Sequence, residues 1–145
     1  MALYSQERFP EALSELQAYR RMSGRADQNH LIADCLRAVG RPERVVPLVE
    51  EALRSKAPNE AKAEVVIVGA SALADLGRHE EALALLRRAR TTEGVGRAYV
   101  LRLWYVTGDT LAKAGRPEEA AREFRKVLRH DPGAFDAAER LAELG

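Results

Sequence analysis

Cysteine, lysine and long apolar runs are all scarce in this 145-residue sequence. Its one cysteine, Cys35, excludes an intrachain disulfide and zinc sites built from paired cysteines. The longest stretch without a charge, VVIVGASALA (65–74), is far shorter than the roughly 20 apolar residues that span a bilayer. The net charge is only +1, so neither nucleic acid nor an anionic membrane surface is indicated. The first residues, MALYSQERFP, lack the basic and apolar segments of a signal peptide, which predicts a cytoplasmic protein.

Three similar stretches recur along the chain. They are AVGRPERVVPLV (38–49), DLGRHEEALALL (75–86) and KAGRPEEAAREF (113–124). Their glycines, Gly40, Gly77 and Gly115, follow one another at intervals of 37 and 38 residues, and QERFPEALSEL (6–16) fits the same frame without the glycine. A period in this range is typical of stacked two-helix units. The repeated stretches therefore predict an array of helix hairpins.

Each stretch carries the residues that end one helix and begin the next. The glycine suits the left-handed residue that follows a helix, and Pro10, Pro42 and Pro117 suit a first helical turn. The acids near the positive ends of the new helices are Glu11, Glu43, Glu80, Glu81, Glu118 and Glu119. The small residues that let two helices approach are Ala12, Val45, Ala82 and Ala120. Each repeat is thus expected to contain a tight helix–turn–helix.

The third unit resembles a tetratricopeptide repeat, whose pattern is W-x2-L-G-x2-Y, then A-x3-F, then P. The residues that carry the resemblance are Trp104, Thr107, Gly108, Leu111, Ala120, Phe124 and Pro132, with Thr107 and Leu111 departing from the pattern. The resemblance implies an all-α fold, a solenoid of stacked antiparallel helix hairpins with about eight helices and a C-terminal capping helix. It also implies that Gly108 and Ala120 are close-packing positions within one hairpin.

We expect a single domain over residues 1–145. Its parts are an incomplete repeat at 1–24, repeats at 25–58, 59–94 and 95–131, and a capping helix at 132–145. The helices are expected near 9–22, 27–39, 42–55, 59–76, 79–90, 96–114, 117–130 and 133–144. Pro47 lies inside the third of these and cannot donate a backbone hydrogen bond, so we expect a kink or a late start there. The last helix should close the stack with Phe135, Ala138 and Leu141.

In a tetratricopeptide array the first helix of each unit lines a concave surface, on which partner peptides usually lie. The positions that the family frame places there are Asp27, His30, Leu31, Asp34, Arg37, Glu64, Ile67, Val68, Ser71, Asp75, Arg102, Tyr105, Val106, Asp109 and Lys113. This surface lacks the Lys/Asn/Arg set with which family members clamp a terminal carboxylate. It fits a basic or mixed peptide better, or a helix laid in a groove. The alternative is an ordinary solvated face.

Few residues suggest chemistry. Asp27, His30 and Asp34 share one helical face, but a structural zinc site needs four ligands, usually with Cys or two His among them. Cys35 lies among apolar residues, where a buried and inert thiol is expected. Neither a nucleophile with its base nor a phosphate-binding loop is evident. We therefore expect a non-enzyme without a cofactor or a metal, which binds another protein or peptide.

Two other functions remain open. The arginines, as in RRAR (87–90), could contact nucleic acid, although their place at helix C-termini already has a structural cause. The chain could also be a structural segment that packs on an upstream domain, because it looks like the C-terminal part of a longer actinobacterial repeat protein. The helix at 9–22 has an apolar face without a preceding partner, made of Phe9, Leu13, Leu16 and Tyr19. That face predicts a homodimer through the N-terminal helix. The alternative is that residues 1–8 fold back as a short cap and the chain stays monomeric.

Overall fold

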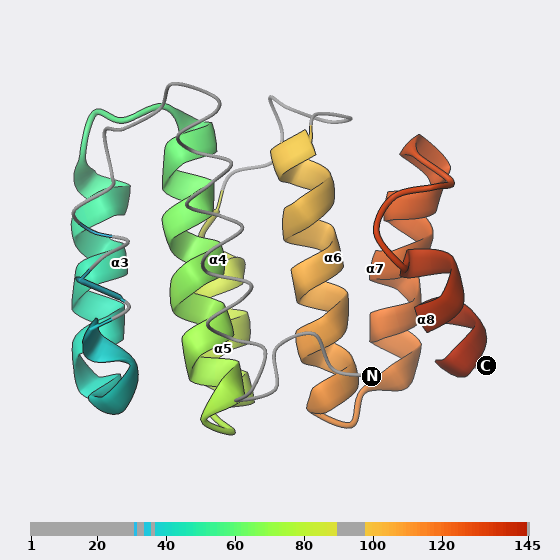
Figure 1. Cartoon of the computed structure of the whole chain (residues 1–145), viewed down its shortest axis with the longest axis horizontal. Helices are drawn as coiled ribbons and strands as arrows, with labels where there is room; N and C mark the ends of the chain where they lie inside the picture. Colours follow the sequence, from blue (N-terminus) through green and yellow to red (C-terminus); the bar gives the residue numbers. More distant parts are fainter. Residues whose placement is uncertain (1–30, 32–33, 36, 90–97, 145) are drawn as a thin grey trace. The chain divides into compact units, whose positions relative to one another are not determined.

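A computed structural model describes residues 31, 34–35, 37–89 and 98–144 of the chain. Their elements are the 3₁₀ helices η1 (Ala38–Gly40) and η2 (Pro42–Arg44) and the α-helices α3 (Val45–Arg54), α4 (Asn59–Asp75), α5 (His79–Leu86), α6 (Ala98–Lys113), α7 (Pro117–His130) and α8 (Ala137–Leu144). This part of the chain is all-α and its helices pack in antiparallel pairs (Figure 1). The same part contains six α-helices, so the expected count of about eight is not supported. The expected helix at 9–22 lies outside the described residues.

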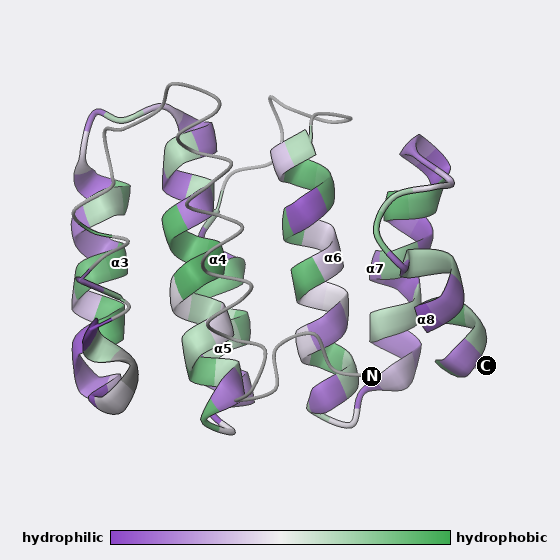
Figure 2. Cartoon of the chain, viewed as in Figure 1, coloured by the Kyte–Doolittle hydropathy of each residue, from purple (hydrophilic) through white to green (hydrophobic). Residues whose placement is uncertain are grey.

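The chain divides into two compact units, Met1–Ala89 and Arg90–Gly145. In the first unit α4 packs against α3 and against α5. Every residue of α4 from Ala63 to Ala74 is buried, and Figure 2 shows the middle of this helix as hydrophobic. A Cβ atom on Gly69 would lie 2.5 Å from Cγ2 of Val49 in α3. The glycine therefore allows α3 to approach the backbone of α4.

Two of the three turn glycines behave as the sequence predicts. Gly77 and Gly115 have φ angles of 83° and 78°, in the left-handed region. At each turn the next residue donates to the carbonyl five positions back: Arg78 N to Leu73 O at 2.8 Å, and Arg116 N to Leu111 O at 2.9 Å. This is the Schellman arrangement, which satisfies carbonyls that the helix end leaves unpaired.

The prediction for the remaining turn glycine, Gly40, is wrong. Gly40 ends the 3₁₀ helix η1 instead of taking a left-handed φ, and Arg41 N donates to Ala38 O at 2.7 Å. A second 3₁₀ turn, η2, follows at once and delays the start of α3 to Val45. Pro47 consequently falls in the first turn of α3, where its missing N–H removes no helical hydrogen bond. The late start expected at this proline is confirmed.

In the second unit, α6 and α7 form a hairpin and α8 packs on α7. A Cβ atom on Gly108 would lie 2.8 Å from the ring of Phe124, which is fully buried in α7. Ala120, one turn before Phe124, is also fully buried. The close approach of the two helices at Gly108 confirms the predicted pairing of this hairpin. The expected bounds of α7, 117–130, are those of the structure.

The last helix differs from its prediction in start and in orientation. Asp131 accepts a bond from Gly133 N, and turns close at Ala134 and Ala137, so α8 begins at Ala137 instead of 133. Phe135, expected on the inner face, is 49% exposed with φ at +53°, and Ala138 is exposed as well. Ala137 and Arg140 are the buried residues of α8. The inner face therefore has a charged residue at its centre.

Candidate functional site

The candidate surface of the first unit is only partly accessible. His30 lies outside the described residues, and Leu31, Ile67, Val68 and Ser71 are buried. Asp34 forms an ion pair with the exposed Arg37. Asp75 is half-buried at the end of α4. The apolar positions and Ser71 are therefore packing residues in this structure, and Asp34, Arg37 and Asp75 provide what surface there is.

The second unit shows the same division. Tyr105, Val106 and Asp109 are buried, with 2%, 1% and 0% exposure, whereas Arg102 and Lys113 are half-buried. The side chain of Tyr105 is therefore part of the hydrophobic core and is not exposed for contact with a partner. Arg102 is thus the accessible candidate on this helix, because the Nζ atom of Lys113 is buried beside Asp109.

The buried Asp109 is the centre of a charged cluster that joins α6 to α8. Its Oδ1 lies 2.7 Å from Nη1 of Arg140, and its Oδ2 lies 3.2 Å from Nζ of Lys113. Arg140 also donates to the hydroxyl of Tyr105 at 3.4 Å. A carboxylate without exposure needs such partners, because an unpaired buried charge is strongly unfavourable. The cluster explains why a charged residue sits on the inner face of α8.

Tyr105 extends the same cluster toward the loop before α8. Its hydroxyl donates to Asp136, and its ring lies 4.8 Å from the ring of Phe135 and 5.6 Å from that of Phe124. Burial and the bond to Asp136 raise the pKa of Tyr105 above its ordinary value. The hydroxyl therefore stays protonated, as a donor, at neutral pH. Tyr105 thus connects α6 to the loop before α8, and Asp109 connects α6 to α8 itself.

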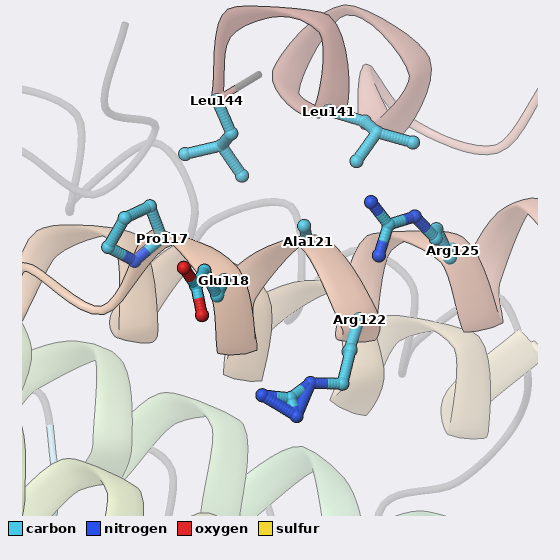
Figure 3. A pocket seen from close by; sticks show the side chains of 7 residues that line it. All are labelled: Pro117, Glu118, Ala121, Arg122, Arg125, Leu141 and Leu144. Carbon is cyan, nitrogen blue, oxygen red and sulfur yellow. The ribbon is translucent and has the colours of Figure 1, made fainter.

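A groove of about 640 Å³ opens between α7 and α8 (Figure 3). Pro117, Ala121 and Arg125 form a row at i, i+4 and i+8 on α7, and Leu141 and Leu144 point toward it from α8. Glu118 and Arg122 line it as well. Ala121 is buried at 8% exposure, the two leucines are half-buried, and both arginines are exposed. The groove thus has an apolar floor with charged groups beside it.

The described segments show no cluster of metal-binding side chains. No set of three or more His, Cys, Asp or Glu side chains among these residues is placed to hold a metal ion. Cys35 is buried, as expected from its neighbours, and burial raises the pKa of its thiol to about 12. The described helices include none that is long and apolar enough to cross a membrane.

A family model described as Tetratrico peptide repeat matches residues 31–132. The chain belongs to this family. Tetratricopeptide repeat domains are in general modules for protein–protein interaction and are typically non-catalytic. No curated protein and no solved structure matches the chain.

The tetratricopeptide match ends at Pro132, before α8 begins. The groove between α7 and α8 therefore joins a helix inside the matched range to one beyond it. The sequence carries a partial signal for it, because Ala121 and Arg125 are one turn apart and Leu141 and Leu144 are three residues apart. What the sequence could not supply is the placement of α8 on α7. The face proposed for self-association, Phe9, Leu13, Leu16 and Tyr19, lies outside the described residues.

Proposed function

We propose that this tetratricopeptide repeat chain is a non-catalytic scaffold that binds a peptide or a helix of another protein. The binding surface is the face formed by the first helices of the repeats, the concave side of an α-solenoid. The family match over residues 31–132 carries the proposal. The hairpin turns at Gly77 and Gly115 support it, because each ends the first helix of its hairpin with the same hydrogen-bond pattern.

The burial pattern narrows the proposed contacts. The side chains that remain accessible on the proposed face are polar: Asp34, Arg37, Asp75 and Arg102. They carry both signs of charge, so they suit a partner segment of mixed charge. The buried Ile67, Val68 and Tyr105 would support these side chains by packing the helices that carry them.

The test is capture of a partner by the full chain, with charge-reversed variants. Arg102→Glu changes the proposed face, and Arg129→Glu makes the same change at an exposed position in the last turn of α7. Proteins retained from a cell extract by the wild type should be lost by Arg102→Glu and kept by Arg129→Glu. Circular dichroism should show that both variants remain folded at the temperature of the capture experiment.

Retention of the same proteins by Arg102→Glu and by Asp75→Lys would refute the proposed face. A retained fraction that consists of nucleic acid, and that is released steeply as salt rises, would favour the nucleic-acid alternative instead.

A further inference from the structure

We propose that the groove between α7 and α8 is a second docking site, which takes an amphipathic, acidic helix of a partner protein. This goes beyond the first-helix face, because the groove is lined by α7 and α8 alone. Three features of the groove carry it: its length, its half-buried leucines and its arginines.

The groove is long enough to hold about two turns of an α-helix. Pro117 and Arg125 are eight positions apart on α7, which is about 12 Å at 1.5 Å per residue, or roughly two helical turns. Opposite this row, Leu141 and Leu144 are one turn apart on α8. Side chains at this spacing form the ridge that packs between the side chains of a neighbouring helix. An apolar stripe of the partner would thus lie along Ala121 and the two leucines.

The inner face of α8 explains why these leucines remain half-buried. Ala137 and Arg140 are buried, and Arg140 is held toward α6 by Asp109. Leu141 and Leu144 lie at the edge of this face, where α8 leaves α7 partly uncovered. Covering such side chains with a partner's apolar residues removes further apolar area from water, which favours association.

The charges beside the groove select an acidic partner. Arg122 and Arg125 are exposed, and neither is paired with an acid among the residues that the structure describes. The neighbouring acids have cations of their own: Glu119 lies 3.1 Å from Arg116, and Glu123 lies 2.9 Å from Lys126. Only Glu118 opposes the two arginines in the lining. Acidic residues on both sides of a partner's apolar stripe would pair with them.

The experiment uses two synthetic helical peptides and a charge exchange. Both peptides carry leucines at i, i+3 and i+7, and their flanking positions are glutamate in one and lysine in the other. The full-length wild type should bind the glutamate peptide in fluorescence anisotropy, with an affinity that falls as salt rises. The double variant Arg122→Glu, Arg125→Glu should weaken this binding about tenfold or more and should bind the lysine peptide better than the wild type does.

The control is the double variant Arg87→Glu, Arg129→Glu, which changes net charge equally at exposed positions outside the groove. It should keep the wild-type affinity for the glutamate peptide, and both double variants should melt at the wild-type temperature. Amide shifts in NMR should concentrate on α7 and α8. Arg102→Glu should leave the peptide affinity unchanged, so failure of the first-helix face and failure of the groove are separable.

Three results would overturn the proposal. The first is a wild type that binds neither peptide. The second is glutamate-peptide binding that persists in Arg122→Glu, Arg125→Glu or shifts α6 instead of α8. The third is a concentration-dependent dimer that these substitutions abolish, since the groove would then hold a second copy of the chain.

Discussion

The ion pair between Asp109 and Arg140 should dominate the stability of the second unit. Asp109 has no exposed surface, and the side chain of Arg140 is 10% exposed. Removing one partner of a buried pair costs about 3–5 kcal/mol, because the other charge is left without compensation. In Arg140→Met, Lys113 still lies 3.2 Å from Asp109 and retains part of the attraction. We therefore expect the lower end, about 3 kcal/mol.

The matched variant is Asp109→Leu with Arg140→Met, which replaces both charges by apolar groups. Replacement of a whole buried pair is often neutral or stabilising, so the double variant should be more stable than either single one. A loss of 3 kcal/mol corresponds to roughly 6–12 °C in melting temperature for a chain of this size. Thermal and urea unfolding, followed by circular dichroism, would measure the double-mutant cycle.

The cycle also has a clear negative result. Substitutions without a shared interaction add within about 0.5 kcal/mol. If the losses from Asp109→Leu and Arg140→Met simply add, the two side chains are not coupled, and their ion pair does not set the orientation of α8. Lys113→Met serves as the reference, because Lys113 lies 3.2 Å from Asp109 and its removal leaves Arg140, at 2.7 Å, in place, so it should cost less.

Three further outcomes follow from packing, titration and assembly. Ala120→Leu should lower the free energy of unfolding by about 1–3 kcal/mol in urea titrations, since it overfills a fully buried position, and a neutral effect would contradict the pairing of α6 with α7. The pKa values of Tyr105 and of Cys35 are raised in the folded chain, so stability should be complete below their ordinary values of 10.0 and 9.0 and should fall as pH rises from about 9 to 12. Tyr105→Phe should flatten this alkaline loss in pH-dependent melting curves, and an unchanged slope would count against it. Light scattering should show a dimer that Leu16→Glu with Tyr19→Glu converts to a monomer, and a wild-type monomer at every concentration would reject the predicted self-association.

The sequence predicts best what depends on local chemistry. The left-handed glycines at 77 and 115, the late start around Pro47 and the bounds of α7 all follow from preferences of single residues and their near neighbours. The same reasoning fails at Gly40, where two 3₁₀ turns replace the left-handed residue. A glycine permits that conformation but does not impose it.

What the sequence leaves open depends on contacts between distant residues. Asp131 and Pro132 suggest a helix start, yet successive turns delay the start of α8 to Ala137. The orientation of α8 depends on the ion pair of Arg140 with Asp109, which lies 31 positions earlier in the chain. The prediction places Ile67, Val68 and Ser71, from the uncharged run 65–74, on the binding surface. A helical segment that has no polar face is usually buried on all sides, and this one is. The groove between α7 and α8 arises only once both helices are placed.

The contact between Gly108 and Phe124 has a consequence for how copies of this hairpin would diverge. The ring fills the space that a side chain on Gly108 would need, so neither position can change size freely. Gly108→Ala should be tolerated only when Phe124 is replaced by a smaller residue. A smaller residue at position 124 alone would leave a cavity, which a larger residue at position 108 could fill. In a large set of functional variants these two positions should therefore exchange volume as a pair, while the solvent-facing residues between them vary independently.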